Sequence, residues 1–384
     1  MLVSRLVLKN WRNFKHADVK LRERAFIVGP NASGKSNLLD VFRFLRDIAK
    51  SEGGGLQKAI RDRGGISKLR CLAARKDPEI IVEVELAETY DSASKWKYSI
   101  GIRQQPRGER LPFVSQEEVW EDDRLVLNRP DKEDTSDEAR LTQTYLEQIN
   151  ANAGFRDIAR FFQTVTYLHL VPQLIRYADA FQGKRLEDDP FGQGFLESVA
   201  KTTERTRLTR LLRIQEALKI AVPQMQQLRF LRDENNGRPH LEALYSHWRP
   251  KAGWQREDQF SDGTLRLIGL LWSLLGGDSM LLLEEPELSL NSGIVQRLAP
   301  LIYRAQRSRK RQIVISTHSY DLLRDKGIDA SEVLILIPDT EGTTVQLAEA
   351  VSDVKELLSG GMSIGDAVLP LTNPRTSHQL SMFE

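Results

Sequence analysis

The sequence predicts an α/β fold built around a phosphate-binding loop, and three observations predict it. Residues 29–36 read Gly-Pro-Asn-Ala-Ser-Gly-Lys-Ser, which fits the pattern Gly-x-x-x-x-Gly-Lys-Ser. The apolar run 25–28 precedes this motif, and residues 37–50 follow it with apolar side chains at helical spacing. Two further apolar runs with polar tips, 280–287 and 313–318, lie near the C-terminus. The order of strand, glycine loop and helix is the context that such a loop requires.

The motif assigns a role to its residues. Successive backbone N–H groups in such a loop form a concave anion site at a helix N-terminus. We expect Lys35 to reach the outer phosphates of ATP and the Ser36 hydroxyl to bind Mg²⁺. The residues predicted to bind nucleotide are Gly29, Asn31, Ala32, Ser33, Gly34, Lys35, Ser36 and Asn37.

Arg12 is a further candidate for nucleotide contact. Residues 2–10 alternate apolar and polar side chains, and Trp11-Arg12-Asn13-Phe14 follows them. This hairpin-like segment brings Arg12 near the phosphate loop only if the sheet closes in that way. An ordinary surface arginine is an equally good interpretation.

Composition bounds the class of protein. The 384 residues are 40% hydrophobic, which is enough for a core in one large domain or in two to three smaller ones. A formal charge of +2 restricts any DNA-binding surface to a local patch. The single cysteine, Cys71, excludes an intrachain disulfide framework and agrees with a reducing compartment. No run of 18 apolar residues and no export signal are evident, so we expect a cytoplasmic protein without a membrane span.

The remaining chain predicts a mixture of strands and helices. Antiparallel strands are expected at 80–86, 96–102, 114–120 and 124–127. A polar loop is expected at 128–139, helical structure at 141–167, and one long helix at 195–222 that Pro223 stops. Later elements are a hairpin (227–231 and 240–245), helices (264–275 and 292–307), a strand pair (333–337 and 343–347) and two short helices (354–358 and 364–369).

Strand–helix alternation at both ends indicates one composite fold in which the two ends share a sheet. We therefore expect an N-terminal lobe at 1–130, with the phosphate loop and an antiparallel β subdomain, and an inserted helical lobe at 131–255. A C-terminal lobe at 256–370 and a flexible tail at 371–384 complete the prediction.

Two acids follow the apolar run 281–283. Glu284 and Glu285 stand at the tip of a predicted buried strand, where α/β sheets place ligands. The first acid, Glu284, is expected to hold the Mg²⁺ shell, and the second, Glu285, to orient and deprotonate an attacking water. Together with the phosphate loop, this pair predicts Mg²⁺-dependent ATP hydrolysis.

Four motifs in this order resemble the ABC-type ATPases of the RecF/SMC class. They are the phosphate loop after Asn10-Trp11-Arg12-Asn13-Phe14, the run 260–266 (Phe-Ser-Asp-Gly-Thr-Leu-Arg), the run 281–287 (Leu-Leu-Leu-Glu-Glu-Pro-Glu) and Ser316-Thr317-His318-Ser319. The chain is most similar to the overcoming-lysogenisation-defect-like AAA family ATPases of bacteria. The resemblance covers residues 1–60 and 255–350 and is much weaker between them.

The resemblance implies roles for the matching residues. Ser261, Asp262 and Gly263 match the signature loop, which contacts the γ-phosphate held by the opposite subunit. Glu285 matches the catalytic glutamate and His318 the switch histidine, while 289–291 occupies the dimer-contact loop. The family works as a head-to-tail homodimer with two ATP molecules between the subunits.

This sequence departs from the family pattern at two places. Glu284 stands where an Asp is usual, and Asn291 stands where many relatives have His-Pro or Asp. The glutamine loop stays open among three candidates, Gln104, Gln163 and Gln173. No coiled-coil heptads and no appended nuclease cluster are evident, which leaves room for a separate nuclease or toxin partner.

Two basic segments have two interpretations each. Lys201, Arg205, Arg207, Arg210 and Arg213 form either a phosphate-binding face or a solvated basic face. The basic residues at 304–311 crowd a predicted helix C-terminus, which the helix dipole favours, and DNA contact is the alternative.

The tail and the motifs lead to three hypotheses on function. Residues 379–383 (Gln-Leu-Ser-Met-Phe) are similar to the peptide by which bacterial proteins dock on the replication sliding clamp. The first hypothesis is a DNA-associated dimeric ATPase switch that controls a nuclease or toxin in anti-phage defence. The second is a repair or recombination ATPase that docks on the clamp through Gln379–Phe383. The third is a sensor or scaffold that binds nucleotide without hydrolysing it.

Overall fold

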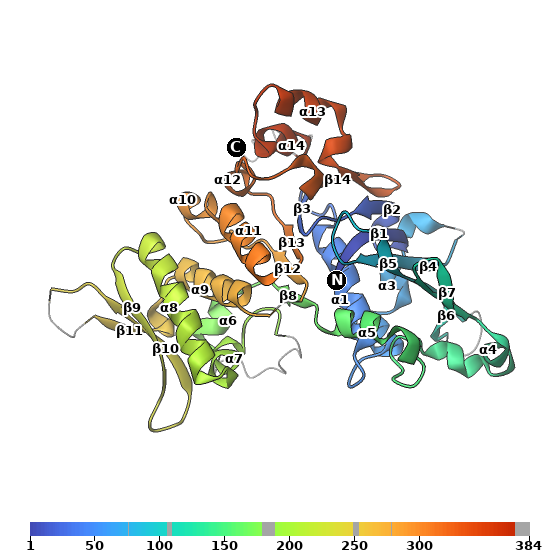
Figure 1. Cartoon of the computed structure of the whole chain (residues 1–384), viewed down its shortest axis with the longest axis horizontal. Helices are drawn as coiled ribbons and strands as arrows, with labels where there is room; N and C mark the ends of the chain where they lie inside the picture. The colour runs from blue at the N-terminus through green and yellow to red at the C-terminus, as the bar shows by residue number, and fades with distance from the viewer. Residues whose placement is uncertain (76, 106–109, 179–188, 249–252, 278, 373–384) are drawn as a thin grey trace, which may run out of the picture. The chain divides into compact units, whose positions relative to one another are not determined.

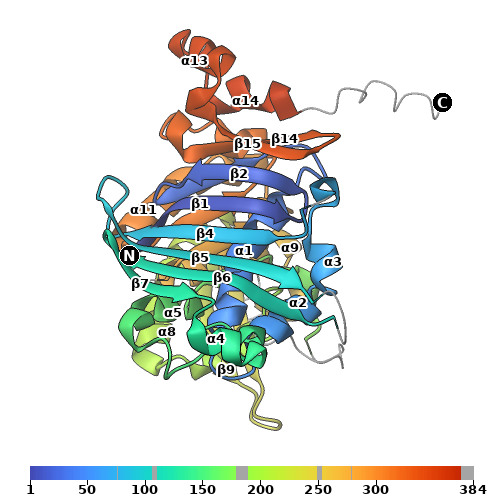
Figure 2. The same cartoon turned by 90° about the vertical axis from the view of Figure 1, so that its right-hand side faces the viewer.

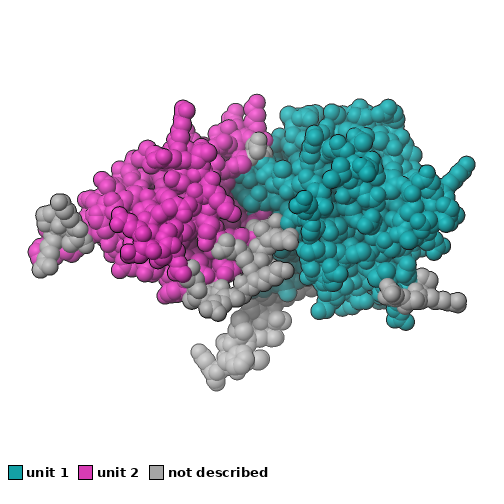
Figure 3. Space-filling view, turned by 90° about the horizontal axis from the view of Figure 1, so that it is seen from below, with its two compact units in different colours: residues 1–166, 279–282, 311–384 teal, residues 167–278, 283–310 magenta. Residues whose placement is uncertain are grey.

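The computed structural model of the chain forms two compact units. It describes residues 1–75, 77–105, 110–178, 189–248, 253–277 and 279–372. Unit 1 comprises residues 1–166, 279–282 and 311–384, and unit 2 comprises residues 167–278 and 283–310, as coloured in Figure 3. The sequence placed boundaries after residues 130, 255 and 370, whereas the compact units divide the chain near 166, 278, 282 and 310.

One sheet of unit 1 is antiparallel and has the strand order β2-β1-β4-β5-β6-β7. Its strands, seen side by side in Figure 2, are β1 (Leu2–Trp11), β2 (Phe14–Lys20), β4 (Ile80–Ala87), β5 (Ser94–Gln104), β6 (Pro112–Glu121) and β7 (Arg124–Arg129). Leu6 pairs with Val19 on one side and with Val84 on the other, and all three side chains are buried. The alternation of apolar and polar residues therefore places one face of this sheet on the core.

The second sheet has the order β15-β14-β3-β13-β12-β8, and β3 lies between β14 and β13. Its strands are β3 (Arg24–Val28), β8 (Thr166–Leu168), β12 (Leu281–Glu284), β13 (Ile313–Ser316), β14 (Val333–Asp339) and β15 (Gly342–Leu347). Both β13 and β14 run parallel to β3, which is buried along its whole length. Such continuous apolar strands are typical of parallel sheets covered on both faces. The prediction that the two ends of the chain share one sheet is confirmed.

Helix α1 (Lys35–Ala49) follows β3 and contacts α5 (Arg156–Gln163) and β13. The other helices of unit 1 are α2 (Leu56–Asp62), α3 (Ile66–Leu69), α4 (Lys132–Ser136), α12 (Tyr320–Leu323), α13 (Ser352–Ser359) and α14 (Ile364–Thr372). Short 3₁₀ turns cover Leu72–Ala74, Glu138–Thr142, Ala153–Phe155, Ala330–Glu332 and Ala348–Ala350. The predicted helical stretch 141–167 is thus mostly turns, and only α5 is an α-helix.

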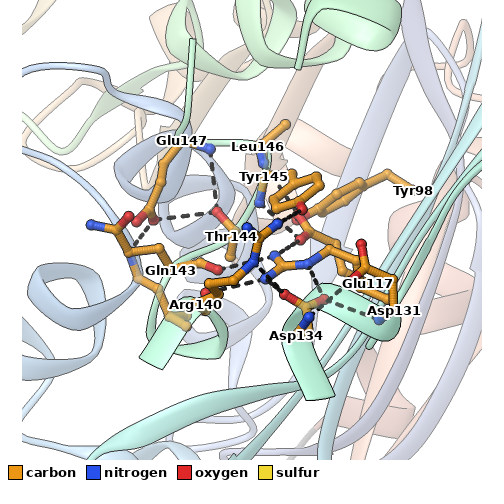
Figure 4. A network of polar contacts seen from close by, with 12 residues as sticks. Tyr98, Glu117, Asp131, Asp134, Arg140, Gln143, Thr144, Tyr145, Leu146 and Glu147 are labelled. Carbon is orange, nitrogen blue, oxygen red and sulfur yellow. Dashed lines mark hydrogen bonds and ion pairs between the residues drawn. The ribbon is translucent and has the colours of Figure 1, made fainter. Parts of the chain in front are cut away.

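The segment 128–139, predicted as a polar loop, instead contains helix α4 and takes part in the network of polar contacts shown in Figure 4. The Arg129 guanidinium is fully buried and donates to Glu117 Oε2 at 2.9 Å and to both carboxylate oxygens of Asp134 at 2.8 Å. Tyr98 Oη and the backbone N–H of Tyr145 donate to Glu117. Because buried charges need such partners, the charged side chains fold this segment onto β6 rather than leaving it in solvent.

Unit 2 combines helices with a three-stranded sheet of order β11-β10-β9. The strands are β9 (Met225–Arg232), β10 (Pro239–Tyr245) and β11 (Trp254–Arg256), and a 3₁₀ turn covers Glu257–Gln259. The helices are α6 (Pro172–Arg176), α7 (Phe195–Lys201), α8 (Glu204–Ala221), α9 (Asp262–Leu275), α10 (Ser292–Val295) and α11 (Leu298–Arg309). Helix α9 is the buried centre of these helices and contacts α6, α8 and α11 (Figure 1).

Two predicted helices are each divided. The stretch 195–222 breaks into α7 and α8 because Thr202 and Thr203 are extended (ψ 139° and 145°). The stretch 292–307 breaks between α10 and α11 at Gln296–Arg297. Within the described residues, none of the helices is both long and apolar enough to cross a membrane.

Candidate nucleotide-binding site

The phosphate loop lies between β3 and α1, as predicted. Ala32 and Gly34 adopt left-handed backbone conformations, with φ of 63° and 100°. A Cβ atom on Gly34 would lie 2.1 Å from the Asn13 Nδ2 atom, so a side chain at residue 34 clashes in addition to its backbone strain. Gly29 is close to its surroundings too, since a Cβ there would lie 2.9 Å from the Leu336 carbonyl oxygen. The two motif glycines are therefore required by the local packing.

Two residues outside the motif hold the loop. Asn13 Nδ2 donates to the Ser33 carbonyl oxygen at 2.8 Å, and the Thr343 hydroxyl donates to the same oxygen at 3.0 Å. Asn13 Oδ1 also accepts from Asn37 Nδ2 at 2.8 Å. Neither Asn13 nor Thr343 was predicted as a site residue, because nothing in the sequence links positions 330 residues apart.

The loop fits a nucleotide phosphate group. Lys35 Nζ donates to the carbonyl oxygens of Gly29 and Pro30, at 2.9 and 3.1 Å, so its charge lies over the loop. Ser33 Oγ is buried and makes no hydrogen bond to any described residue. Asn31 and Ala32 in the loop and Ser36 at the start of α1 are exposed. A positive charge, exposed loop positions and a helix N-terminus converge there, which is the environment that a phosphate and its Mg²⁺ need.

Arg12 takes part in a structural ion cluster next to the loop. Its Nη2 donates to Asp40 Oδ2 at 2.6 Å, and Arg63 donates to both carboxylate oxygens of Asp40 at 3.0 Å. Burial alone would raise the pKa of Asp40, but the neighbouring guanidinium groups, that of Arg63 foremost, hold the pKa below its usual value. The structure thus gives Arg12 a partner in α1, and its contact with nucleotide stays a prediction.

His318 lies at the same sheet edge as the phosphate loop. Strand β13 runs parallel to β3 with Ser316 opposite Ile27, and the Thr317 N–H donates to the Ile27 carbonyl at 3.1 Å. His318 and Gly29 are each two residues beyond this last pair, and His318 is exposed. Because carboxyl ends of parallel strands are where α/β proteins bind ligands, the register supports the predicted position of this histidine.

Glu284, the predicted Mg²⁺ ligand, ends β12, and Glu285, the predicted catalytic base, follows directly after the strand. Glu284 is the last strand residue, and the Tyr167 hydroxyl donates a hydrogen bond to its Oε2 atom. Tyr167 therefore orients the longer side chain that stands here in place of the usual aspartate. Glu285 adopts a left-handed conformation with φ of 46°, which turns the chain sharply before Pro286. The sequence offered no signal for Tyr167.

The predicted signature loop begins α9 in unit 2. Ser261 is the exposed N-cap, and its Oγ accepts from the Thr264 N–H at 3.2 Å. The Asp262 carboxylate accepts from Arg176 at 2.6 Å and from Gln173 at 2.7 Å. A Cβ on Gly263 would lie 2.6 Å from the Ser289 carbonyl oxygen. The signature loop thus lies directly against the predicted dimer-contact loop 289–291, in which Asn291 caps α10.

The three glutamine-loop candidates lie in different places. Gln173 binds Asp262 of the signature loop. Gln163 donates to the Ala49 carbonyl at the C-terminal end of α1, which is the end away from the phosphate loop. Gln104 is exposed at the end of β5 and donates to the Arg110 carbonyl. Gln173 alone among them contacts a predicted site residue in the structure.

The predicted site residues belong to both units. The phosphate loop, Arg12 and His318 are in unit 1, whereas Glu284, Glu285 and Ser261–Gly263 are in unit 2. The clamp-like peptide at 379–383 lies outside the described residues.

This fold and loop define a P-loop NTPase with the α/β architecture of an SMC or ABC ATPase head, including its antiparallel sheet, so the predicted fold class is confirmed. A family profile described as "AAA domain, putative AbiEii toxin, Type IV TA system" matches residues 24–325. The chain belongs to this family of AAA-domain ATPases. None of the curated proteins compared with the chain matches it.

Solved structures of Smc heads are similar to this chain. An Smc head crystallised with the C-terminal winged-helix domain of ScpA has 16% sequence identity and a TM-score of 0.54, and the match covers 91% of this chain and 100% of that one. An Smc head from Pyrococcus furiosus has 15% identity and a TM-score of 0.48, with 93% and 99% of the two chains covered. An SMC head from Thermotoga maritima has 16% identity and a TM-score of 0.46, with 90% and 99% covered. At such identities, the likeness concerns the fold alone.

Proposed function

We propose that the chain is an ATP-hydrolysing switch that pairs with a second copy of itself when ATP is bound. The observation that carries this proposal is the shared edge of β3 and β13, from which the phosphate loop and His318 emerge at matching positions. Lys35 and the loop N–H groups bind the triphosphate, and His318 senses its outer phosphate. Glu285 accepts a proton from the attacking water.

Ser36 and Glu284 are the residues that would hold Mg²⁺, which neutralises phosphate charge when it is bound. The hydrogen bond from Tyr167 keeps the Glu284 carboxylate in one orientation for this task. Ser261 is exposed at the N-terminus of α9, where backbone N–H groups and the helix dipole favour an anion. In a head-to-tail pair, this terminus completes the phosphate site of the other copy.

The biological setting is part of the same proposal. The family description names a putative AbiEii toxin and a type IV toxin–antitoxin system, which supports a role in defence. Control of a separate toxin or nuclease partner is proposed on the resemblance of the motifs alone. Kinship with the overcoming-lysogenisation-defect-like ATPases and association with DNA are proposed on the motifs quoted above. A repair role with clamp docking is the alternative, which deletion of 379–384 tests through clamp pull-down.

Variants of Lys35 and Glu285 test the hydrolytic proposal. Glu285→Gln should bind ATP with unchanged affinity, lose phosphate release by at least a hundredfold and accumulate as an ATP-bound dimer in size-exclusion chromatography. Lys35→Ala should lose nucleotide binding. Glu234→Gln and Lys355→Ala, both exposed, are matched controls and should behave as the unaltered protein.

Three results would contradict parts of this proposal. Turnover at the normal rate in Glu285→Gln would remove the assigned base. Binding of ATP without phosphate release by the unaltered protein would favour the nucleotide-dependent scaffold. A chain that stays monomeric with ATP in Glu285→Gln would exclude the pairing.

A further inference from the structure

A pocket in unit 2 is lined by arginine side chains. Helix α8 contributes Arg205, Arg210 and Arg213 together with Thr206 and Thr209, and Arg309 closes the pocket from the end of α11. Its cavity volume is about 220 Å³, well above the roughly 10–15 Å³ that a cavity needs to hold one water. No acidic residue is among the described residues that line it.

Arg210 lies at the inner side of this pocket under conditions that are unfavourable for a cation. Its Nε atom is buried and makes no hydrogen bond to any residue that the structure describes. Burial, and then repulsion from Arg309, lowers the pKa of Arg210. The Trp272 ring, 5.1 Å from the guanidinium carbon, offers only its face as a partner. An ion of opposite sign beside this half-buried guanidinium would offset both the burial and the repulsion.

Arg210 and Arg309 both lie against the C-terminal end of α9. Leu275 is the last residue of α9, and Arg309 Nη2 donates to its carbonyl oxygen at 2.6 Å. A Cβ on Gly276 would lie 3.1 Å from Arg210 Nη1, so the guanidinium lies directly against the end of α9. Thr206 Oγ1 accepts a hydrogen bond from Thr203, which leaves the Thr206 hydroxyl proton available to a ligand.

We propose that this pocket binds a phosphoryl group at a site separate from the phosphate loop. Several guanidinium groups around one cavity match the oxygens of a phosphate, because each planar fork can donate two parallel hydrogen bonds. The phosphoryl group comes either from a free phosphorylated small molecule or from the backbone of a nucleic acid. On this assignment the first turns of α8 are a recognition element rather than a solvated face.

Binding is measured on the full chain carrying Lys35→Ala, which removes competition from the phosphate loop. The probes are pyrophosphate, AMP and a 12-nucleotide single-stranded oligonucleotide. Calorimetry measures the binding of each probe at two salt concentrations. Arg210→Gln and Arg309→Gln should each weaken a bound probe at least tenfold. Arg304→Gln is the matched control, because this substitution removes the same charge. Arg304 lies on α11 but is not among the described residues that line the pocket.

The pattern across the probes identifies the source of the phosphate. Pocket-dependent binding of pyrophosphate or AMP assigns a small phosphorylated ligand, and pocket-dependent binding of the oligonucleotide alone assigns a nucleic acid backbone. Equal losses in all three variants, or no binding of any probe, would overturn the proposal. Arg213→Gln, on the exposed rim, repeats the test if Arg210→Gln fails to fold. These outcomes are independent of ATP turnover, which is measured with Lys35 intact.

Discussion

Two residues outside the recognisable motif anchor the phosphate loop. Asn13 and Thr343 both donate to the Ser33 carbonyl, and Asn13 also accepts from Asn37 at the start of α1. The motif residues are visible in the sequence because their spacing is local. Their anchors come from two hairpins at opposite ends of the chain, and a single asparagine or threonine there has no pattern that could reveal it.

Asn13→Ala should therefore weaken ATP binding. The change leaves one hydrogen bond, from Thr343, on the Ser33 carbonyl and removes the partner of Asn37. A loss of about 1–3 kcal/mol is typical when a buried polar group loses its partner, and ~1.4 kcal/mol corresponds to about tenfold in Kd. Nucleotide titration measures it, with Asn235→Ala in the exposed β9–β10 turn as control. An unchanged Kd would show that the loop keeps its shape without Asn13.

At the scale of elements, local periodicity predicts the strands and helices that bury one face. It does not predict a segment that is ordered by ion pairs with residues distant in the sequence. The strands of the antiparallel sheet and helix α1 were predictable because each buries one face or one stripe. The segment 128–139 was misjudged because its charges resemble a solvated loop, and only the structure shows that Arg129 pairs with Glu117 and Asp134. Likewise, neither Pro nor Gly marks the break between α7 and α8.

Glu147 near this network makes stability depend on pH. Burial raises the pKa of Glu147 to about 7, although its Oε2 accepts from the Leu56 N–H at 2.7 Å. Because the folded-state pKa lies above the unfolded value, the folded chain keeps the proton longer. The free energy of unfolding therefore falls as pH rises from about 4.5 to about 7. At higher pH it stays at this lower value, because Glu147 is then ionised in both the folded and the unfolded chain.

Glu147→Gln should remove this contribution. The variant cannot ionise, so its free energy of unfolding relative to the unaltered protein should rise across the same pH range, by on the order of 3 kcal/mol for the full shift. Denaturant unfolding at pH 4.5 to 8 measures the difference. Glu138→Gln, exposed in the same segment, should run parallel to the unaltered protein. A constant difference between Glu147→Gln and the unaltered protein would contradict the titration.

At the scale of the whole molecule, sequence and structure agree on the class of fold, while the predicted division into lobes stays a prediction beside the two compact units. Shared strands from both ends were predictable from apolar runs with polar tips. The compact units were not, because their limits follow which helices surround α9 rather than any change of composition. The proposed pairing of two copies is likewise a property that no single motif determines.

Mixing two inactive variants tests that pairing. Ser261→Arg places a bulky cation at the exposed signature turn, and Lys35→Ala disables the phosphate loop. Each alone should lack turnover. In an equal mixture half of the pairs are mixed, and each mixed pair has one intact site out of two, so turnover should return to about a quarter. A mixture as inactive as its components would exclude a head-to-tail arrangement with shared sites.

The double anchoring of the Ser33 carbonyl makes completion of the loop depend on how far synthesis of the chain has progressed. A growing chain emerges from the ribosome with residues 29–36 early and with Thr343 only after more than three hundred further residues. Until β15 has been synthesised and added beside β14, the loop lacks one of its two anchors. Nucleotide capture at full strength therefore requires a chain that has been synthesised through β15.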